Sequence, residues 1–376
     1  MVKIVNPFVT SGYVSPRYFC NREEESKYLM REITNGNNVA LISARRMGKT
    51  GLIMHCFNKK EIKEHYNLFF IDIYATASLR DFVFALSKEI VEQLKPAGKK
   101  AIETFWATVK SLQTGISFDV AGVPSFNVRL GDIQSEETTL DEIFKYLHQS
   151  AKPCVIAIDE FQQINHYPEK NVEALLRTHI QHCNNARFIF AGSQRHVMDK
   201  IFTSASRPFY QSVSIQHLNS IQINDYVSFA MNHFNENDKK ISAEIIQSAY
   251  NRFNGITWYV QKLLNSLFAM TTIGGECTLN MIDEAIENNV NSYKYTYSET
   301  LFRLPIKQKE VLVAIAKEGD AKAITSAKFI KKHRLSSSSS VQSALRGLLE
   351  KDFVTHEKGS YQVYDKFLAI WLNENY

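Results

Sequence analysis

The sequence predicts an α/β protein in which a parallel sheet is followed by a helical segment and a smaller C-terminal domain. Up to about residue 220, short apolar runs alternate with helical segments, which is typical of a parallel sheet covered on both faces. From residue 224 to about 291 the pattern is helical, and after Pro305 it changes to helices followed by two short strands. A chain of 376 residues is also too long for one ordinary core, so two or three domains are expected.

Short apolar runs predict the strands of the sheet. Runs of this kind, bounded by polar or turn residues, indicate strands that are buried on both faces. Helices are expected between them, first over Thr50–Asn58 and then over Ser78–Leu94. The predicted strands are Asn38–Ser43, Asn67–Ile73, Pro153–Ile158, Arg187–Ala191 and Gln211–Ile215.

One segment, residues 96–137, interrupts this alternation. Apolar side chains alternate with others on both sides of Gly122-Val123-Pro124, which predicts a β-hairpin inserted between two elements of the sheet domain. The alternating positions are Ile116, Phe118, Val120, Phe126, Val128 and Leu130.

The composition is that of a globular protein. Apolar residues make up 44% and charged residues 22%, and no stretch approaches the roughly 20 apolar residues that a membrane helix needs. Residues Met1–Pro7 lack the apolar core of a secretory signal. The five cysteines are scattered, odd in number and never spaced as C-x-x-C, which indicates a reducing compartment. We therefore expect a cytoplasmic protein without a membrane partner.

Between the first strand and the first helix lies Ser43–Thr50, with the sequence Ser-Ala-Arg-Arg-Met-Gly-Lys-Thr. It matches the phosphate-binding loop G-x-x-x-x-G-K-[ST], the P-loop, except that serine replaces the first glycine. In a P-loop, backbone N–H groups and the helix N-terminus hold the β- and γ-phosphates, the lysine reaches them, and the threonine hydroxyl binds Mg²⁺. A serine at this position strains the backbone if the position needs a positive φ. The candidate nucleotide-binding residues are Ser43, Ala44, Arg45, Arg46, Met47, Gly48, Lys49, Thr50 and Gly51.

Two carboxylates, Asp159 and Glu160, follow the third predicted strand. Asp159 is placed to hold Mg²⁺ through water, and Glu160 can polarise the water that attacks the γ-phosphate. An apolar run followed by Asp-Glu is common by itself, but together with a P-loop upstream it forms half of a nucleoside-triphosphate site. The predicted catalytic residues are Lys49 and Glu160, and the predicted metal ligands are Thr50 and Asp159.

Three further positions have open alternatives. Ser193 follows the fourth strand and would lie beside the carboxylates, where it could sense the γ-phosphate, but serine is also a preferred helix N-cap. Arg195 and Arg207 could reach a phosphate as arginine fingers do, although arginines at such positions are more often solvated surface residues.

These motifs resemble those of archaeal-type ATPases within the AAA+/STAND group of P-loop proteins. The resemblance covers about residues 15–300 and implies ATP as the nucleotide, a sheet of strand order 5-1-4-3-2, a helical lid, and adenine held between the entry segment and the lid. In the lid motif, usually Gly-x-Pro followed by an aromatic pair, Thr257 stands in place of the proline. The segments that carry the resemblance are Arg22–Glu25, Ala44–Thr50, Ile158–Phe161, Gly192–Ser193, Ser206–Tyr210 and Asn254–Gln261.

The segment after Pro305 is predicted to form a winged helix-turn-helix. In its third helix, apolar residues recur at i, i+3, i+4, i+7 and i+8 from Val341, which is the pattern of one buried helix face. In a DNA-binding winged helix this helix enters the major groove. The predicted elements are helices over Ile306–Lys317 and Ser326–His333, a third helix capped by Ser337 or Ser338, and strands over Phe353–His356 and Ser360–Tyr364.

Charge favours DNA as the partner of this winged helix. From Pro305 to the end there are twelve Lys or Arg and eight Asp or Glu residues, and the stretch 321–349 has six basic residues and no acidic one. Such a basic surface can hold a polyanion. Winged helices also serve as protein-docking modules, so a protein partner stays the alternative. The candidates are Gln342, Ser343 and Arg346 for base edges, Lys331, Lys332 and Arg334 for phosphates, and Lys358 in the wing.

The sequence thus predicts three domains, a sheet domain over 1–220, a helical lid over 221–300 and a winged helix over 301–376. The expected activity is slow, Mg²⁺-dependent ATP hydrolysis that acts as a switch and is coupled to binding of double-stranded DNA. The alternative is a nucleotide-loaded signalling or scaffold protein whose winged helix docks a protein. A homo-oligomer is compatible with both.

Overall fold

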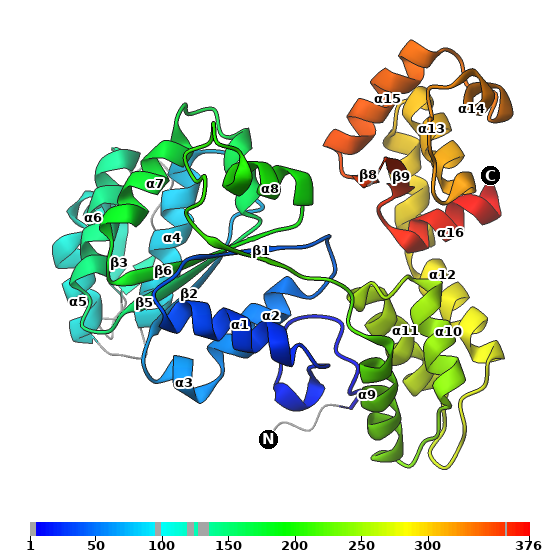
Figure 1. Ribbon diagram of the computed structural model, residues 1–376, viewed down its shortest axis with the longest axis horizontal. Coiled ribbons are helices and arrows are strands. Elements are labelled where there is room, and N and C mark those ends of the chain that lie inside the picture. The colour runs from blue at the N-terminus through cyan, green and yellow to red at the C-terminus, as the bar shows by residue number, and fades with distance from the viewer. Residues whose placement is uncertain (1–4, 95–98, 119–123, 127–134, 358) are drawn as a thin grey trace. The chain divides into compact units, whose positions relative to one another are not determined.

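The computed structural model describes residues 5–94, 99–118, 124–126, 135–357 and 359–376 (Figure 1). Its packing divides the chain into two compact units. The N-terminal unit consists of Met1–Phe229 with Gly255–Gln261, and the C-terminal unit consists of Ala230–Asn254 with Lys262–Tyr376. The domain borders at residues 220 and 300 stay a prediction.

A five-stranded parallel sheet forms the centre of the N-terminal unit, as predicted. Its strands are β1 (Val39–Ile42), β2 (Asn67–Asp72), β5 (Cys154–Asp159), β6 (Ala186–Gly192) and β7 (Ser214–His217). They lie in the order β2-β5-β6-β1-β7, which confirms the implied order 5-1-4-3-2. The apolar runs located the first four strands to within one residue at each end. The fifth strand begins three residues later than its predicted run, at Ser214.

Helices cover both faces of this sheet (Figure 1). They are α1 (Glu23–Thr34), α2 (Lys49–Phe57), α3 (Lys60–Lys63), α4 (Leu79–Leu94), α6 (Glu136–Gln149), α7 (Val172–His182) and α8 (Arg195–Thr203), with 3₁₀ helices η1 (Pro16–Tyr18) and η5 (Phe161–His166). Val39 and Leu41 of β1 pack in one apolar cluster with α1 and α2, whereas Ala40 and Ile42 pack in another with α4, α6, α7 and α8. Alternate residues of a strand point to opposite faces of the sheet, so β1 contributes residues to both clusters.

The inserted segment contains a two-stranded antiparallel sheet. β3 (Ile116–Phe118) pairs with β4 (Pro124–Phe126), with Ile116 opposite Phe126. The other alternating positions of the predicted hairpin, Val120, Val128 and Leu130, lie outside the described residues.

Two elements that were not predicted, α5 (Lys99–Thr108) and η3 (Lys110–Gly115), precede this small sheet. Phe105 and Trp106 of α5 are buried, and the Phe105 ring meets the Tyr146 ring of α6 edge-on at a centroid distance of 5.0 Å. Aromatic side chains of this kind bury large areas, which explains why the insertion packs on the sheet domain.

The C-terminal unit is helical up to Arg303 and ends in a winged helix, as predicted. α9 (Ile223–Asn235) and α11 (Thr257–Met270) begin in the N-terminal unit and end in the C-terminal unit. The remaining elements are α10 (Ala243–Arg252), α12 (Asn280–Arg303), α13 (Ile306–Glu318), α14 (Ala327–Lys332), α15 (Ser338–Glu350), β8 (Val354–Glu357), β9 (Ser360–Val363) and α16 (Lys366–Asn375). Among the described residues, no helix has the length and apolar character needed to cross a membrane.

The third helix of the winged helix, α15, has the predicted cap and the predicted buried face. The Ser337 hydroxyl accepts a hydrogen bond from the Ser340 backbone N–H at 3.2 Å, so Ser337 and not Ser338 is the N-cap. Val341, Ala344, Leu345 and Leu348 are buried. The opposite face of the helix is left to solvent.

A helix that was not predicted, α16, follows the hairpin of the winged helix. Asp365 caps this helix by accepting from the backbone N–H groups of Phe367 and Leu368. The helix packs against α12 and α13, and the ring of its Trp371 lies 5.9 Å from that of Tyr297 in α12. The winged helix is therefore fixed to the last helix of the preceding segment within the same unit.

Candidate functional site

The predicted site residues come together at the carboxyl edge of the sheet, where β1, β5 and β6 end. Thr50, at the start of α2, donates a hydrogen bond from its hydroxyl to the Asp159 carboxylate at 2.7 Å. Asp159 is the last residue of β5 and not the residue after it. The two motifs, which are 109 residues apart in the chain, therefore form one site.

The backbone of the P-loop turns at two residues in the left-handed region. Gly48 has a φ of 91° and Arg46 has a φ of 65°. Ser43 is not among the residues with positive φ, so the serine at this position carries no backbone cost. It is fully buried, and its hydroxyl donates to the Ala44 carbonyl at 2.7 Å and accepts from Lys49 Nζ at 3.3 Å.

Buried charges of both signs face each other in this site. Burial lowers the pKa of Lys49, Glu160 and Asp159 oppose that shift, and Arg45 and Arg195 add to it. Burial also raises the pKa of Asp159, against the Thr50 hydrogen bond and the Lys49 charge. The contribution of Asp159 to the stability of the fold is lost as the pH rises through its raised pKa. The contribution of Lys49 is lost as the pH falls through its lowered pKa. Burial therefore disfavours the charged form of both groups, and a bound polyanion and cation can offset that cost.

The carboxylate of Glu160 is held by two donors. Its Oε2 atom accepts from the Ser193 hydroxyl at 2.5 Å and from Nε2 of Gln162. Ser193 in turn accepts from Arg45 Nε at 3.1 Å. The helix-cap alternative for Ser193 is wrong, because α8 begins at Arg195 and its N-cap is Gln194. Ser193 therefore links the P-loop to Glu160.

Gln162 is a functional candidate that the sequence analysis missed. Its side chain is 3% exposed, and its Oε1 atom has no hydrogen-bond partner among the described residues. A Cβ atom at Gly192 would lie 2.6 Å from that oxygen, so the glycine leaves the room that the amide occupies. In the sequence, only the position of this glutamine, two residues after Asp-Glu, relates it to the site. Its position does not show that its side chain turns toward Glu160.

The start of α11 contacts the outer side of the P-loop. Thr257 donates from its hydroxyl to the Met47 carbonyl at 3.2 Å, and the backbone N–H of Trp258 donates to the Arg46 carbonyl at 3.0 Å. The Arg46 guanidinium lies over the Trp258 ring at 4.3 Å and over the Tyr259 ring at 4.8 Å. The threonine that replaces the expected proline thus makes a polar contact with the loop.

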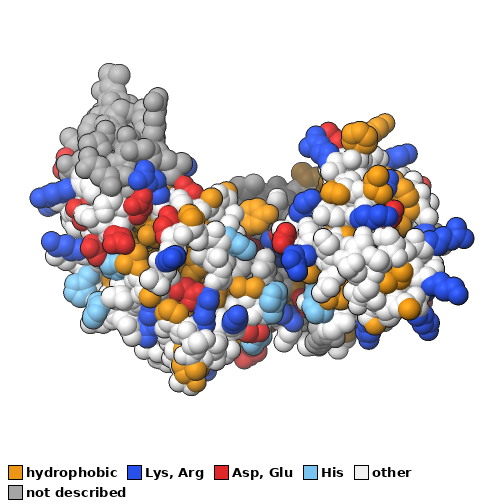
Figure 2. Space-filling model, turned by 90° about the horizontal axis from the view of Figure 1, so that it is seen from above, with side chains coloured by type: hydrophobic (Ala, Val, Ile, Leu, Met, Phe, Trp, Pro, Cys, Tyr) orange, Lys and Arg blue, Asp and Glu red, His pale blue; other side chains and the backbone are white. Residues whose placement is uncertain are grey.

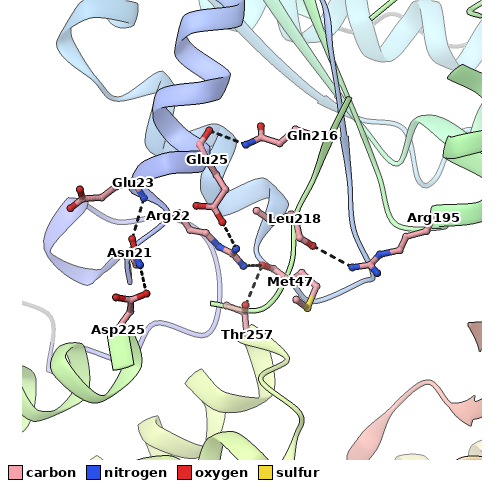
Figure 3. Close-up of polar contacts among 10 residues, drawn as sticks. All are labelled: Asn21, Arg22, Glu23, Glu25, Met47, Arg195, Gln216, Leu218, Asp225 and Thr257. Atoms are coloured by element: carbon pink, nitrogen blue, oxygen red, sulfur yellow. Dashed lines mark hydrogen bonds and ion pairs between the residues drawn. The ribbon is translucent and has the colours of Figure 1, made fainter. Parts of the chain in front are cut away.

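The entry segment reaches the same carbonyl from another side (Figure 3). Arg22 is 3% exposed and has a left-handed backbone with a φ of 67°. Its guanidinium donates to the Met47 carbonyl at 3.2 Å and to Glu25 at 2.7 Å. Arg22 and Thr257 therefore both fix the P-loop backbone at Met47.

An aromatic group lies beside α2, close to the P-loop. The Phe19 and His55 rings stack at 4.4 Å, and the Tyr13 hydroxyl lies 3.1 Å from His55 Nδ1. Burial lowers the pKa of His55 to about 4, with Lys59 adding to the shift, so the imidazole is neutral at neutral pH. A Cβ atom at Gly51 would approach the Phe19 ring to 3.3 Å.

The structure distinguishes between Arg195 and Arg207, the two arginines that the sequence analysis considered as possible arginine fingers. Arg207 pairs with the Glu173 carboxylate and the Asn165 side chain. Arg195 donates to the Leu218 carbonyl at 3.3 Å, and its buried Nε has no partner among the described residues (Figure 3). Arg195 therefore belongs to the charge environment of Lys49, and Arg207 does not.

The predicted DNA-binding residues lie on the C-terminal unit. Lys331, Arg334, Gln342, Ser343 and Arg346 are exposed. Figure 2 looks onto the side of this unit that carries α14 and α15, and Lys and Arg side chains predominate there over acidic ones. Lys332 is exposed but pairs with Glu318 at 2.6 Å, which reduces the charge that it can offer a phosphate. Lys358 lies outside the described residues.

Two parts of the chain match known protein families. Residues 19–263 match a family described as an ATPase domain predominantly from Archaea, and residues 295–374 match one described as a probable winged helix domain. The first match spans more than half of the chain. No curated protein matches the sequence.

Solved structures of similar fold include three archaeal proteins. A Walker-type ATPase of Pyrococcus abyssi has a TM-score of 0.63 at 17% identity, covering 98% of this chain and 99% of that one. The ORC2 protein of Aeropyrum pernix, in ADPNP and ADP complexes, has a TM-score of 0.59 at 13% identity, covering 98% and 95%. The ORC1 protein of the same organism, in complex with DNA, has a TM-score of 0.55 at 12% identity, covering 96% and 94%. At such identities the likeness is one of fold.

Proposed function

Because the chain belongs to the family of ATPases found predominantly in Archaea, we propose that it uses Mg²⁺-ATP as a switch for DNA binding by its winged helix. The chain is a nucleotide-binding ATPase with a C-terminal winged helix. One observation supports the proposed use of ATP. The hydrogen bond from Thr50 to Asp159 and the hydrogen bonds that connect Arg45, Ser193 and Glu160 lie at the same edge of the sheet.

Each residue of the site has a proposed role. The backbone from Ala44 to Gly51 surrounds the phosphates, and Lys49 contacts their terminal oxygens. Thr50 and Asp159 fit Mg²⁺ because hydroxyl and carboxylate oxygens are the hard ligands that it prefers, and the hydrogen bond of 2.7 Å between them shows that both lie at one place. Bound Mg²⁺ would neutralise charge on the phosphates. Glu160 orients the attacking water and accepts its proton, and Ser193 and Gln162 hold the Glu160 carboxylate in place.

The aromatic group beside α2 is the proposed adenine pocket. Phe19 lies in the entry segment, and His55 lies on α2 five residues after the threonine of the P-loop. A neutral imidazole stacked on a phenyl ring offers an apolar face to a base, with polar atoms at its edge. This placement keeps the entry segment on one side of the adenine, as the resemblance implies, but it puts α2 and not the lid on the other side.

Replacing Gly48 with alanine is expected to weaken nucleotide binding and to destabilise the fold. A φ of 91° is costly for any residue with a Cβ, by roughly 1–3 kcal/mol, and relaxation would turn the N–H groups of the loop away from the phosphates. The matched control is Gly274→Ala, because Gly274 has a φ of 76° in open space away from the loop. Calorimetry should show a lower melting temperature for both variants and weaker ATP binding for Gly48→Ala alone. Equal ATP affinity in the two variants would contradict the proposed role of the loop.

DNA is proposed as the partner of the winged helix. The supporting observation is that the exposed polar face of α15 and the exposed Lys331 and Arg334 belong to the stretch 321–349, which has no acidic residue. Arg346 and Gln342 can read base edges in a major groove, while the lysine and arginine of the preceding turn contact phosphates. The ORC1 protein of similar fold was solved in complex with DNA, which supports the same proposal.

A double substitution, Lys331→Ala with Arg334→Ala, is expected to weaken binding of duplex DNA equally for all sequences. Each lost phosphate contact reduces the slope of log affinity against log salt by about 1, so the double variant should lose about 2. Lys88→Ala, an exposed lysine on α4, serves as the control. Fluorescence anisotropy over a salt series measures both quantities. If the native chain binds no DNA but associates with itself when ATP is added, the winged helix docks protein and the DNA proposal is wrong.

A further inference from the structure

The two neighbouring arginines of the P-loop extend in opposite directions. Arg46 turns outward onto the Trp258 and Tyr259 rings of α11. Arg45 turns across the site, where its Nε donates to Ser193 at 3.1 Å and its guanidinium lies 5.6 Å from the centre of the Tyr74 ring. We propose that Arg45 is a catalytic residue that places its positive charge on the terminal phosphate within its own chain, and so performs in cis the role of an arginine finger.

The hydrogen bonds place Arg45 next to the reacting groups. Ser193 Oγ is shared by Arg45 Nε at 3.1 Å and by Glu160 Oε2 at 2.5 Å. The guanidinium is thus one hydroxyl away from the carboxylate proposed to orient the attacking water. A terminal phosphate contacted by Lys49 and attacked by that water must lie between Lys49 and Glu160, and so within reach of Arg45. This step rests on the proposed function of the site.

Two contacts of Arg45 can be exchanged for a phosphate at low cost. They are made to neutral groups, the Ser193 hydroxyl and the face of the Tyr74 ring, and Tyr74 is 57% exposed. A guanidinium gains more from a doubly contacted phosphate than from either of these groups. Arg207, the other candidate, already pairs with the Glu173 carboxylate and would have to break that pair first.

The charges of the site point to the same role. Arg45 and Arg195 both act to lower the pKa of Lys49, and Glu160 and Asp159 oppose that shift. The Arg45 guanidinium therefore adds positive charge to the site that Lys49 occupies. Positive charge at this place favours a transition state whose charge is spread over the phosphate oxygens.

Arg45→Ala is therefore expected to lower kcat strongly while ADP binding changes little. Arginine fingers are worth roughly 10³–10⁵ in kcat, and with Lys49 still present we expect a loss of at least about 10²-fold. Binding of ADP with aluminium fluoride, which imitates the transition state, should weaken in parallel. Arg45→Lys should recover part of the rate, because it keeps the charge but not the planar fork. Arg207→Ala is the matched control and should retain kcat.

A mixing experiment separates a finger in cis from one in trans. Arg45→Ala and Glu160→Gln chains are mixed in equal amounts and ATP hydrolysis is measured at increasing protein concentration. In the proposed arrangement no mixture regains activity, because no chain contains both groups. Recovery on mixing would show that Arg45 acts on a neighbouring chain and would overturn the proposal.

Further outcomes distinguish this inference from the function on which it rests. If the native chain hydrolyses ATP and Arg45→Ala does so at the same kcat, the inference is wrong and the proposed function stands. If the native chain does not hydrolyse ATP, the proposed function fails first. If Arg45→Ala loses ADP affinity and melting temperature together with kcat, the side chain is structural and the inference is also wrong.

Discussion

Glu160→Gln is expected to slow ATP hydrolysis by a factor on the order of 10²–10⁴ while ATP still binds. Glutamine preserves the size of the side chain but cannot take up a proton from the attacking water. It can still hydrogen-bond to Ser193 and Gln162, whose side chains hold the native carboxylate. The fold and the phosphate contacts should therefore survive, and the loss should appear in kcat.

Phosphate release under saturating ATP measures this effect, and calorimetry measures the affinity. Glu137→Gln, an exposed glutamate at the start of α6, is the control for a general effect of charge. A kcat within threefold of the native value would mean that another group orients the water. An ATP affinity that falls together with kcat would mean that Glu160 supports the loop and does not act on water.

Lys49→Ala is expected to abolish productive nucleotide binding. Hydrogen bonds to charged groups are worth about 1.5–3 kcal/mol each, and loss of the contacts to the terminal phosphates should weaken ATP binding by at least about 100-fold. Lys49 is 6% exposed, and a neutral water in place of its ammonium group would not supply the positive charge that the phosphates need. The Asp159 and Glu160 carboxylates would also lose their nearest buried counter-charge.

Thermal unfolding tests this prediction directly. ATP at about 100 times its Kd should raise the melting temperature of the native chain by roughly 3–6 °C, and that of Lys49→Ala by almost nothing. Lys63→Ala, an exposed lysine on α3, should behave like the native chain. A full rise in the Lys49→Ala variant would place the nucleotide elsewhere.

Much of the fold follows from local patterns in the sequence. The first four strands were located to within a residue because each is a short apolar run. β1 and β5 are buried on both faces, whereas the edge strand β2 is only partly buried on one of its faces. α5 and α16 were missed for a related reason. Both are short, and their burial depends on aromatic partners far away in the chain, Tyr146 for α5 and Tyr297 for α16.

The motifs of the site could be predicted from the sequence, but the directions of its side chains could not. Whether Ser43 needed a positive φ, or Ser193 was a cap, depends on backbone angles and on where α8 begins to within two residues. Arg45 and Arg46 are adjacent and chemically identical, yet Arg45 bonds to Ser193 beside the carboxylates and Arg46 faces α11. Only tertiary packing decides between such directions, so the sequence carries no signal for them.

The central claim is tested most directly by measuring Mg²⁺-ATP hydrolysis with and without duplex DNA. The native chain is compared with the Lys49→Ala and Glu160→Gln variants. An ATPase switch coupled to DNA should hydrolyse ATP slowly alone and faster with DNA, and both substitutions should remove the activity. A native rate that DNA leaves unchanged, and that is no faster than the rate of Glu160→Gln, would contradict the account.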